Sequence, residues 1–151
     1  MKRETTLDLL IELERRERDR VAQVTAQARR ESDAAGATLQ MLRGYRLDYD
    51  ARSPKRGTQD FTTTKVKVHE HFVHRLDRAI DDQHALAGRL DAVTQQREAQ
   101  LLERQRRLKA LETLSLRRET LARLAERRAD QRQTDEFAIQ AFLRSHGRGH
   151  R

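Results

Sequence analysis

The chain has 151 residues, of which 37% are charged, 36% hydrophobic and 4% aromatic, with one proline and no cysteine. This composition argues against a thick hydrophobic core, and the absence of cysteine from the sequence excludes disulfides, thiol nucleophiles and cysteine-bound zinc. The 32 basic residues outnumber the 24 acidic ones and give a net charge of +8, which favours acidic partners, whether proteins, anionic lipid or nucleic acid. The chain is rich in Leu, Ala, Arg, Glu and Gln, so long helices with a narrow apolar stripe are expected, and not disorder.

The first expected element is a helix over about residues 5–51, with two seam rows that each repeat every seven residues. Counted in heptads from Leu7, six of the seven residues in the first row are apolar. This row consists of Leu7, Glu14, Val21, Ala28, Ala35, Leu42 and Tyr49. The second row is placed at Leu10, Glu17, Val24, Glu31, Thr38 and Tyr45. Two such rows predict one strand of a coiled coil whose seam is interrupted by polar residues.

A turn is expected over about residues 52–62, because this stretch holds the sole proline and a glycine, and a run of threonines begins at its end. A second helix follows over about 63–144, and the tail 145–151 is expected to fray.

The second helix also carries seam residues at spacings of four and three. They are Phe72, Leu76, Ala79, Gln83, Leu86, Leu90 and Val93. Between Thr94 and Arg107 the apolar residues thin out and change phase, which predicts a stutter in the coiled coil. A fresh stripe follows, made of Leu108, Leu111, Leu114, Leu121 and Leu124, and then of Phe137, Ile139 and Phe142.

The two helices are expected to fold back on each other, because a long amphipathic helix is not stable alone. Matching the spacings pairs Tyr49 with Phe72, Tyr45 with Leu76 and Leu42 with Ala79, close to the turn. The predicted fold class is therefore all-α, a long two-helix antiparallel coiled coil that forms a single hairpin over 1–151. In this register the N-terminal end of the first helix lies opposite residues near Leu114. About 30 residues of the second helix, roughly 45 Å, are then left without a neighbour. An exposed leucine stripe of this kind needs a partner.

The sequence lacks the patterns that chemistry at an active site would require. It has no Gly-rich phosphate loop, no G-x-S-x-G and no nucleophile beside a base. His69 and His71 point in different directions on a helix, and no second ligand cluster accompanies them or His74. We expect neither an enzyme nor a metal or cofactor site. No apolar run approaches the ~20 residues that span a bilayer, so a cytoplasmic protein is expected.

Four segments, in this order and at these separations, resemble the FliJ proteins of the bacterial flagellar export apparatus. They are LQMLRGYRLDY, FVHRLDRAIDDQ, RRLKALETLSLRR and AERRADQRQTDEFA. The resemblance runs from about Leu7 to Phe142 and implies a hairpin similar to the stalk of rotary ATPases. It also implies a role in flagellum biogenesis, protein export and motility, at the inner membrane of the flagellar base. The implied partners are the hexameric export ATPase, the cytoplasmic part of the membrane-embedded export gate, and export chaperones.

The resemblance suggests two sets of contact residues. The candidates for the export gate are Leu42, Tyr45, Tyr49, Phe72, Leu76, Ala79 and Gln83. The candidates for the ATPase are Leu7, Leu10, Leu108, Leu111, Leu114, Leu121, Leu124, Arg128, Gln131, Asp135 and Phe137. A structural alternative exists for each set: the aromatic residues could simply close the hairpin, and the leucine stripe could extend the coil by self-association.

Two other functions compete with flagellar export. A basic coiled coil could bind nucleic acid or anionic membrane, but acids are mixed with the arginines throughout, and no helix-turn-helix or aromatic platform accompanies them. No nucleic acid is therefore expected. The related stalk protein of a virulence type III secretion system would share the fold and the mechanism.

Overall fold

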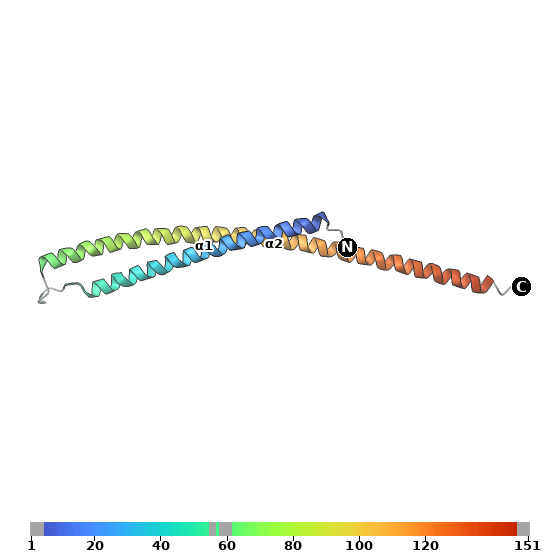
Figure 1. The fold of residues 1–151 in the computed structure, drawn as a ribbon. Helices are drawn as coiled ribbons and strands as arrows, with labels where there is room; N and C mark the ends of the chain where they lie inside the picture. Colours follow the sequence, from blue (N-terminus) through green and yellow to red (C-terminus); the bar gives the residue numbers. More distant parts are fainter. Residues whose placement is uncertain (1–4, 55–56, 58–61, 148–151) are drawn as a thin grey trace. The chain divides into compact units, whose positions relative to one another are not determined.

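The computed structural model describes residues 5–54, 57 and 62–147, nearly all of which lie in two long helices (Figure 1). Helix α1 spans Thr6–Ala51 and helix α2 spans Thr63–Gly147. No strand occurs in these ranges, and the predicted all-α hairpin of two packed helices is confirmed. Most of the expected turn, at 55–56 and 58–61, lies outside the described residues, as does 148–151 of the tail, whereas 145–147 are helical.

Side-chain caps explain where both helices begin. The Asp8 backbone N–H donates to the Thr5 hydroxyl at 3.2 Å, and the Thr5 backbone N–H donates to the Asp8 carboxylate at 2.9 Å. This reciprocal arrangement satisfies donors that a helix start leaves without a partner. At the start of α2, the Lys65 backbone N–H donates to the Thr62 hydroxyl at 3.2 Å. The last turn of α2 carries Arg144 and His146, where positive charge suits the helix dipole.

The chain divides into two compact units, each formed by both helices. Residues 16–105 make up the hairpin unit, and residues 1–15 together with 106–151 make up the terminal unit.

In the hairpin unit, α1 and α2 run side by side in opposite directions (Figure 1). The Tyr49 and Phe72 rings lie 4.3 Å apart between centroids, which confirms the predicted antiparallel register. The first predicted seam row is also correct here, since Val21, Ala28 and Ala35 are buried. Burial in this unit is otherwise narrow and includes Thr25, Leu39, Leu76 and Thr94. The unit is therefore held by a two-helix seam without a wider core.

The second seam row of α1 lies one residue later than predicted. Thr25 and Leu39 are buried and Arg46 is half-buried, whereas Tyr45 is exposed. The same shift occurs on α2: Leu76, Gln83 and Leu90 face the seam as predicted, but the other four predicted positions do not. Phe72, Ala79, Leu86 and Val93 are exposed, and the seam is completed by Val73, Ile80, Ala87 and Thr94. The prediction that Tyr45 packs at the seam against Leu76 is therefore wrong.

Three polar side chains explain this choice of seam, because each reaches a main-chain carbonyl of the opposite helix. The Thr94 hydroxyl lies 3.1 Å from the Ala28 carbonyl oxygen, and the Thr25 hydroxyl lies 3.3 Å from the Arg97 carbonyl oxygen. Gln83 donates its Nε2–H to the Ala35 carbonyl at 3.0 Å. A threonine is short, so these contacts require the helices to approach closely, which small residues such as Ala28 and Ala35 permit.

Replacing Thr94 with valine is expected to lower the free energy of unfolding by about 0.5–1.5 kcal/mol. Valine keeps the buried volume but removes the hydroxyl, which also lies 2.9 Å from the Leu90 carbonyl of its own helix. Thr113→Val is the matched control, since the exposed Thr113 hydroxyl contacts the Lys109 carbonyl of its own turn. Urea denaturation followed by circular dichroism measures the free energy of unfolding of both variants. Equal losses for the two variants would contradict a contribution from the contact between helices.

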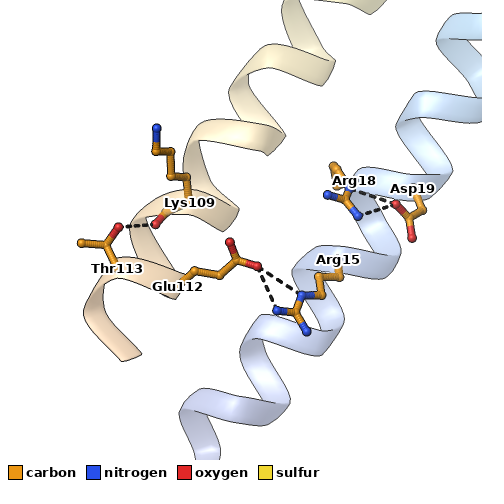
Figure 2. Close-up of polar contacts among 6 residues, drawn as sticks. All are labelled: Arg15, Arg18, Asp19, Lys109, Glu112 and Thr113. Carbon is orange, nitrogen blue, oxygen red and sulfur yellow. Dashed lines mark hydrogen bonds and ion pairs between the residues drawn. The ribbon is translucent and has the colours of Figure 1, made fainter. Parts of the chain in front are cut away.

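In the terminal unit, the start of α1 packs against α2. Ile11 is 7% exposed and Leu108 is 4% exposed, whereas the predicted seam residue Leu10 is exposed. The Arg15 guanidinium donates to the Glu112 carboxylate at 3.0 and 3.2 Å beside this seam (Figure 2). Every residue from 120 to 147 is exposed. Within the described residues, the start of α1 thus contacts α2 as far along as Glu112, and the stretch 120–147 of α2 is not buried.

The predicted stutter of α2 is absent. In the hairpin unit the less exposed residues continue at Thr94, Leu101 and Arg104, and in the terminal unit at Leu108 and Leu111. These positions keep the spacing of seven, or of three and four, without a change of phase. The prediction was wrong because Arg104 occupies a seam position: its long aliphatic stem packs there while its charge reaches Glu17 at 3.7 Å.

Candidate partner-binding surfaces

The first candidate surface is the loop-end cluster, which lies in the hairpin unit near the ends of both helices that flank the turn. It consists of Leu42, Tyr45, Tyr49, Phe72, Leu76, Ala79 and Gln83. Four of these seven residues serve packing. Tyr49 stacks on His69 with ring centroids 4.6 Å apart and an interplanar angle of 12°, and it also contacts Phe72. Leu76 is buried, Leu42 is half-buried, and Gln83 is bonded across the seam.

The other three residues of the loop-end cluster are exposed at the surface. Tyr45 is 55% exposed and Phe72 is 44% exposed, and Ala79 is exposed as well. Large apolar side chains in such positions are available to a partner. The cluster therefore both closes the hairpin and presents aromatic surface.

A shallow hollow adjoins the packed half of this cluster. It is lined by Tyr49, Arg52, Pro54, Thr64, Lys65, Val68 and His69. The hollow is open and its walls combine aromatic, aliphatic and basic groups, which suits a peptide side chain better than an enclosed small molecule.

The second candidate surface lies in the terminal unit, and the structure divides its residues as well. Leu108 is buried, and Leu7 and Leu111 are half-buried against the neighbouring helix. The remaining candidates are exposed. They are Leu10, Leu114, Leu121, Leu124, Arg128, Gln131, Asp135 and Phe137. We call residues 120–147 the exposed C-terminal segment.

Arginines surround the leucines of this segment and of the turns before it. They are Arg117, Arg118, Arg123, Arg127, Arg128 and Arg132, all exposed. Arg123 forms an ion pair with Glu119 at 2.6 Å, and Gln131 donates to Asp135 at 2.9 Å. Leucines surrounded by arginines suit a partner that is itself helical or ring-shaped and carries acidic or polar groups.

Ion pairs shift the pKa values of three groups in the hairpin unit, Glu17, Arg20 and Arg46. A hydrogen bond from Arg20 lowers the pKa of Glu17 against the opposing effect of burial, with the charges of Arg20 and Arg104 adding to it. The bond to Glu17 raises the pKa of Arg20, and bonds to Asp50 and Asp77 raise the pKa of Arg46. These shifts come from ion pairs on the helix surface, and none lies in an enclosed pocket.

Metal ligands do not converge in the part of the chain that the structure describes. Within residues 5–54, 57 and 62–147, no three His, Asp or Glu side chains gather as they would around an ion. Neither α1 nor α2, as described, contains a stretch with the length and hydrophobicity of a membrane-spanning segment.

Sequence reasoning missed three exposed apolar residues of the hairpin unit. Leu86 and Val93 were placed in the seam, and Met41 was assigned no position, yet all three lie at the surface. For Leu86 and Val93 the signal was present, because they form an apolar row with Phe72 and Ala79 beside the two seam rows of α2.

Comparison with known proteins identifies relatives over almost the entire chain. A protein-family model described as "Flagellar FliJ protein" matches residues 2–147. The flagellar FliJ protein of Salmonella typhi is 32% identical over 141 residues, which cover 91% of this chain and 94% of that relative. The flagellar FliJ protein of Escherichia coli strain K12 has the same identity and coverage.

Proposed function

Because the chain belongs to the flagellar FliJ family and is thus a component of the flagellar export apparatus, we propose that it links the export ATPase ring to the export gate. In this role the chain is a mechanical and allosteric connector, and it also receives export chaperones. Any ATP hydrolysis belongs to the partner. The chain lies at the inner membrane of the flagellar base, where its partners hold it.

The observation that carries the ATPase contact is the exposed C-terminal segment. Among the described residues, every position of this segment is exposed, and Leu121, Leu124 and Phe137 are open to water. Isolated helices are marginally stable, and their apolar faces are stabilised when a partner covers them. A ring of subunits with acidic or polar groups at its opening would cover the leucines and neutralise the arginines together.

Support for the gate contact comes from the loop-end cluster. Tyr45 and Phe72 offer aromatic surface, and Phe72 is held against the Tyr49 ring with centroids 4.3 Å apart. Rigid aromatic side chains are effective anchors in interfaces, since little conformational entropy is lost when they bind. The two proposed contacts thus use residues from different units of the chain.

A second candidate function follows from the arginines of the terminal unit, which would also suit nucleic acid or anionic membrane. The structure gives this alternative less support. Acidic residues such as Glu119, Glu126 and Asp130 interrupt the basic surface of the same segment.

The test is a pull-down and ATPase assay with the flagellar ATPase of the same organism. The chain is expected to bind the ATPase and to change ring assembly or hydrolysis, and Leu121→Asp is expected to weaken binding at least about tenfold. Leu116→Asp is the matched control, because Leu116 is 63% exposed and Leu121 is 65% exposed on the same helix. If the unmodified chain does not bind the ATPase, and its binding to DNA or vesicles persists at physiological salt, the second candidate function is supported instead.

A further inference from the structure

The contacts across the seam of the hairpin unit determine which residues of α1 and α2 are level with each other. The Thr94 hydroxyl reaches the Ala28 carbonyl. One heptad further along the seam, Ala35 of α1 therefore faces Ala87 of α2, because a heptad returns each helix to the same face. Ala35 is buried and Ala87 is half-buried. Side chains as small as these interlock less deeply than leucines, so they oppose movement of one helix along the other less strongly.

The hydrogen bonds across this seam do not select one register. Thr25, Gln83 and Thr94 each bond to a main-chain carbonyl, which every residue of the opposite helix supplies. If α2 moved by seven residues toward the start of α1, Thr94 would meet the carbonyl of Val21 in place of that of Ala28. Both carbonyls lie on the same face of α1, so the bond would be exchanged and not lost.

The ion pairs between the helices would be exchanged in the same way. Among those in the hairpin unit are Arg29–Glu98 at 2.7 Å, Arg46–Asp77 at 2.6 Å and Glu17–Arg104 at 3.7 Å. Seven residues before each α2 member of these pairs stands a residue of the same charge. These residues are Asp91, Glu70 and Arg97. A slide of one heptad would therefore give each α1 residue a new partner of opposite charge.

The exchange of charges works in one direction only. Seven residues after the same α2 positions stand Gln105, His84 and Leu111. None of these side chains has a charge opposite to that of its α1 residue, so a slide toward the turn would leave the α1 charges without partners. A heptad repeat by itself would permit both directions, and the charges distinguish between them.

The packing of the seam tolerates the same slide. Leu39 is now level with Gln83 and would become level with Leu76, so that two apolar side chains would meet. The contact between the Tyr49 and Phe72 rings would be broken in exchange. Gains and losses that offset each other in this way allow one sequence to adopt two packings.

The loop end of the hairpin unit leaves room for the movement. Because Tyr49 is level with Phe72, α2 begins beyond the end of α1, and residues 63–70 extend about 12 Å past Ala51 (Figure 1). A slide of seven residues is about 10 Å and would bring the two helix ends level. The shallow hollow beside Tyr49 lies on this path, since its far wall belongs to the first two turns of α2.

We propose that the hairpin unit has two registers, and that α2 passes from the first to the second by sliding seven residues toward the start of α1. The first register is the one that the structure shows, with Tyr49 on Phe72. In the second register Arg46 pairs with Glu70, and the two rings separate. The slide thus rearranges the loop-end cluster, which gives the connector a means of changing its affinity for the gate. This regulatory consequence rests on the proposed gate contact, whereas the two registers do not.

Cysteine pairs that share one position on α2 test the two registers, because the chain has no cysteine of its own. Ala87→Cys with Ala35→Cys is the first-register pair, and Ala87→Cys with Ala28→Cys is the second-register pair. Ala87→Cys with Leu42→Cys is the matched control, since its disulfide requires a slide in the opposite direction. In the full-length chain under mild oxidation, the second-register pair is expected to cross-link at least about tenfold faster than the control. Non-reducing electrophoresis and mass spectrometry measure the rates, and equal rates for these two pairs would overturn the proposal.

Charge reversal tests the second register independently. Glu70→Lys together with Asp91→Lys places like charges beside Arg46 and Arg29 in the second register only. These changes are expected to slow cross-linking of the second-register pair at least about fivefold, and to leave the first-register pair unchanged. Equal slowing of both pairs, or of neither, would overturn the proposal.

Gate binding by the oxidised chains tests the consequence for function. The two disulfide-linked forms are expected to differ at least about tenfold in their affinity for the cytoplasmic part of the gate, and reduction should remove the difference. If both disulfides form and neither chain binds the gate, the proposed function is contradicted, while the cross-linking still supports two registers. If both forms bind the gate equally well, the regulatory consequence is wrong.

Discussion

Leu108→Ala is expected to lower the free energy of unfolding by about 2–4 kcal/mol, the largest loss for a single side chain in the terminal unit. Leu108 is 4% exposed and packs where the start of α1 meets α2. Truncation leaves a cavity between two helices that have no other layer to close over it. Chemical denaturation followed by circular dichroism measures the loss.

Leu116→Ala is the control for this experiment, because it removes the same atoms from an exposed position of the same helix. Its effect is expected to stay within about 0.5 kcal/mol. A similar loss for both variants would show that helix propensity, and not packing against α1, determines the stability of this part of α2.

Motility and gate binding are expected to be lost when Tyr45 and Phe72 are both replaced with alanine. Both side chains stand at the surface, so their removal should weaken gate binding at least about tenfold while most of the helicity survives. Swimming in soft agar and binding to the cytoplasmic part of the gate protein measure the effect.

Leu47→Ala supplies the comparison for the aromatic pair, since Leu47 is more exposed than either residue and lies outside the loop-end cluster. It should leave motility unchanged. If the aromatic variant swims normally, the gate contact is wrong. If it loses its helicity instead, the contact of Phe72 with Tyr49 matters for folding, and the aromatic residues serve mainly to close the hairpin.

The fold and its register could be predicted because both depend on spacing. A heptad repeat indicates a coiled coil, and a single stretch with proline and glycine indicates where it turns back. The match of Tyr49 with Phe72 then determines which residues lie opposite each other, and the structure confirms it. These features need no knowledge of side-chain contacts.

The choice between adjacent apolar rows could not be predicted in the same way. Val24 is more apolar than Thr25, and Val93 is more apolar than Thr94, yet the threonines are buried. Hydropathy penalises a buried hydroxyl, but here a carbonyl of the opposite helix lies within hydrogen-bonding distance and offsets the loss of water. Apolar character alone also does not separate seam from surface: Leu76 and Leu108, both assigned to the candidate surfaces, are buried in the seam.

The bonds from Thr25, Thr94 and Gln83 have a consequence for how this hairpin tolerates mutation. All three donors are side chains, but every acceptor across the seam is a main-chain carbonyl. A substitution can remove a donor, whereas the carbonyl remains whatever residue stands at Ala28, Ala35 or Arg97. The middle of the hairpin should therefore accept sequence change unevenly, strictly at three donor positions and freely at the residues they contact, provided that the replacements remain small enough for the helices to approach.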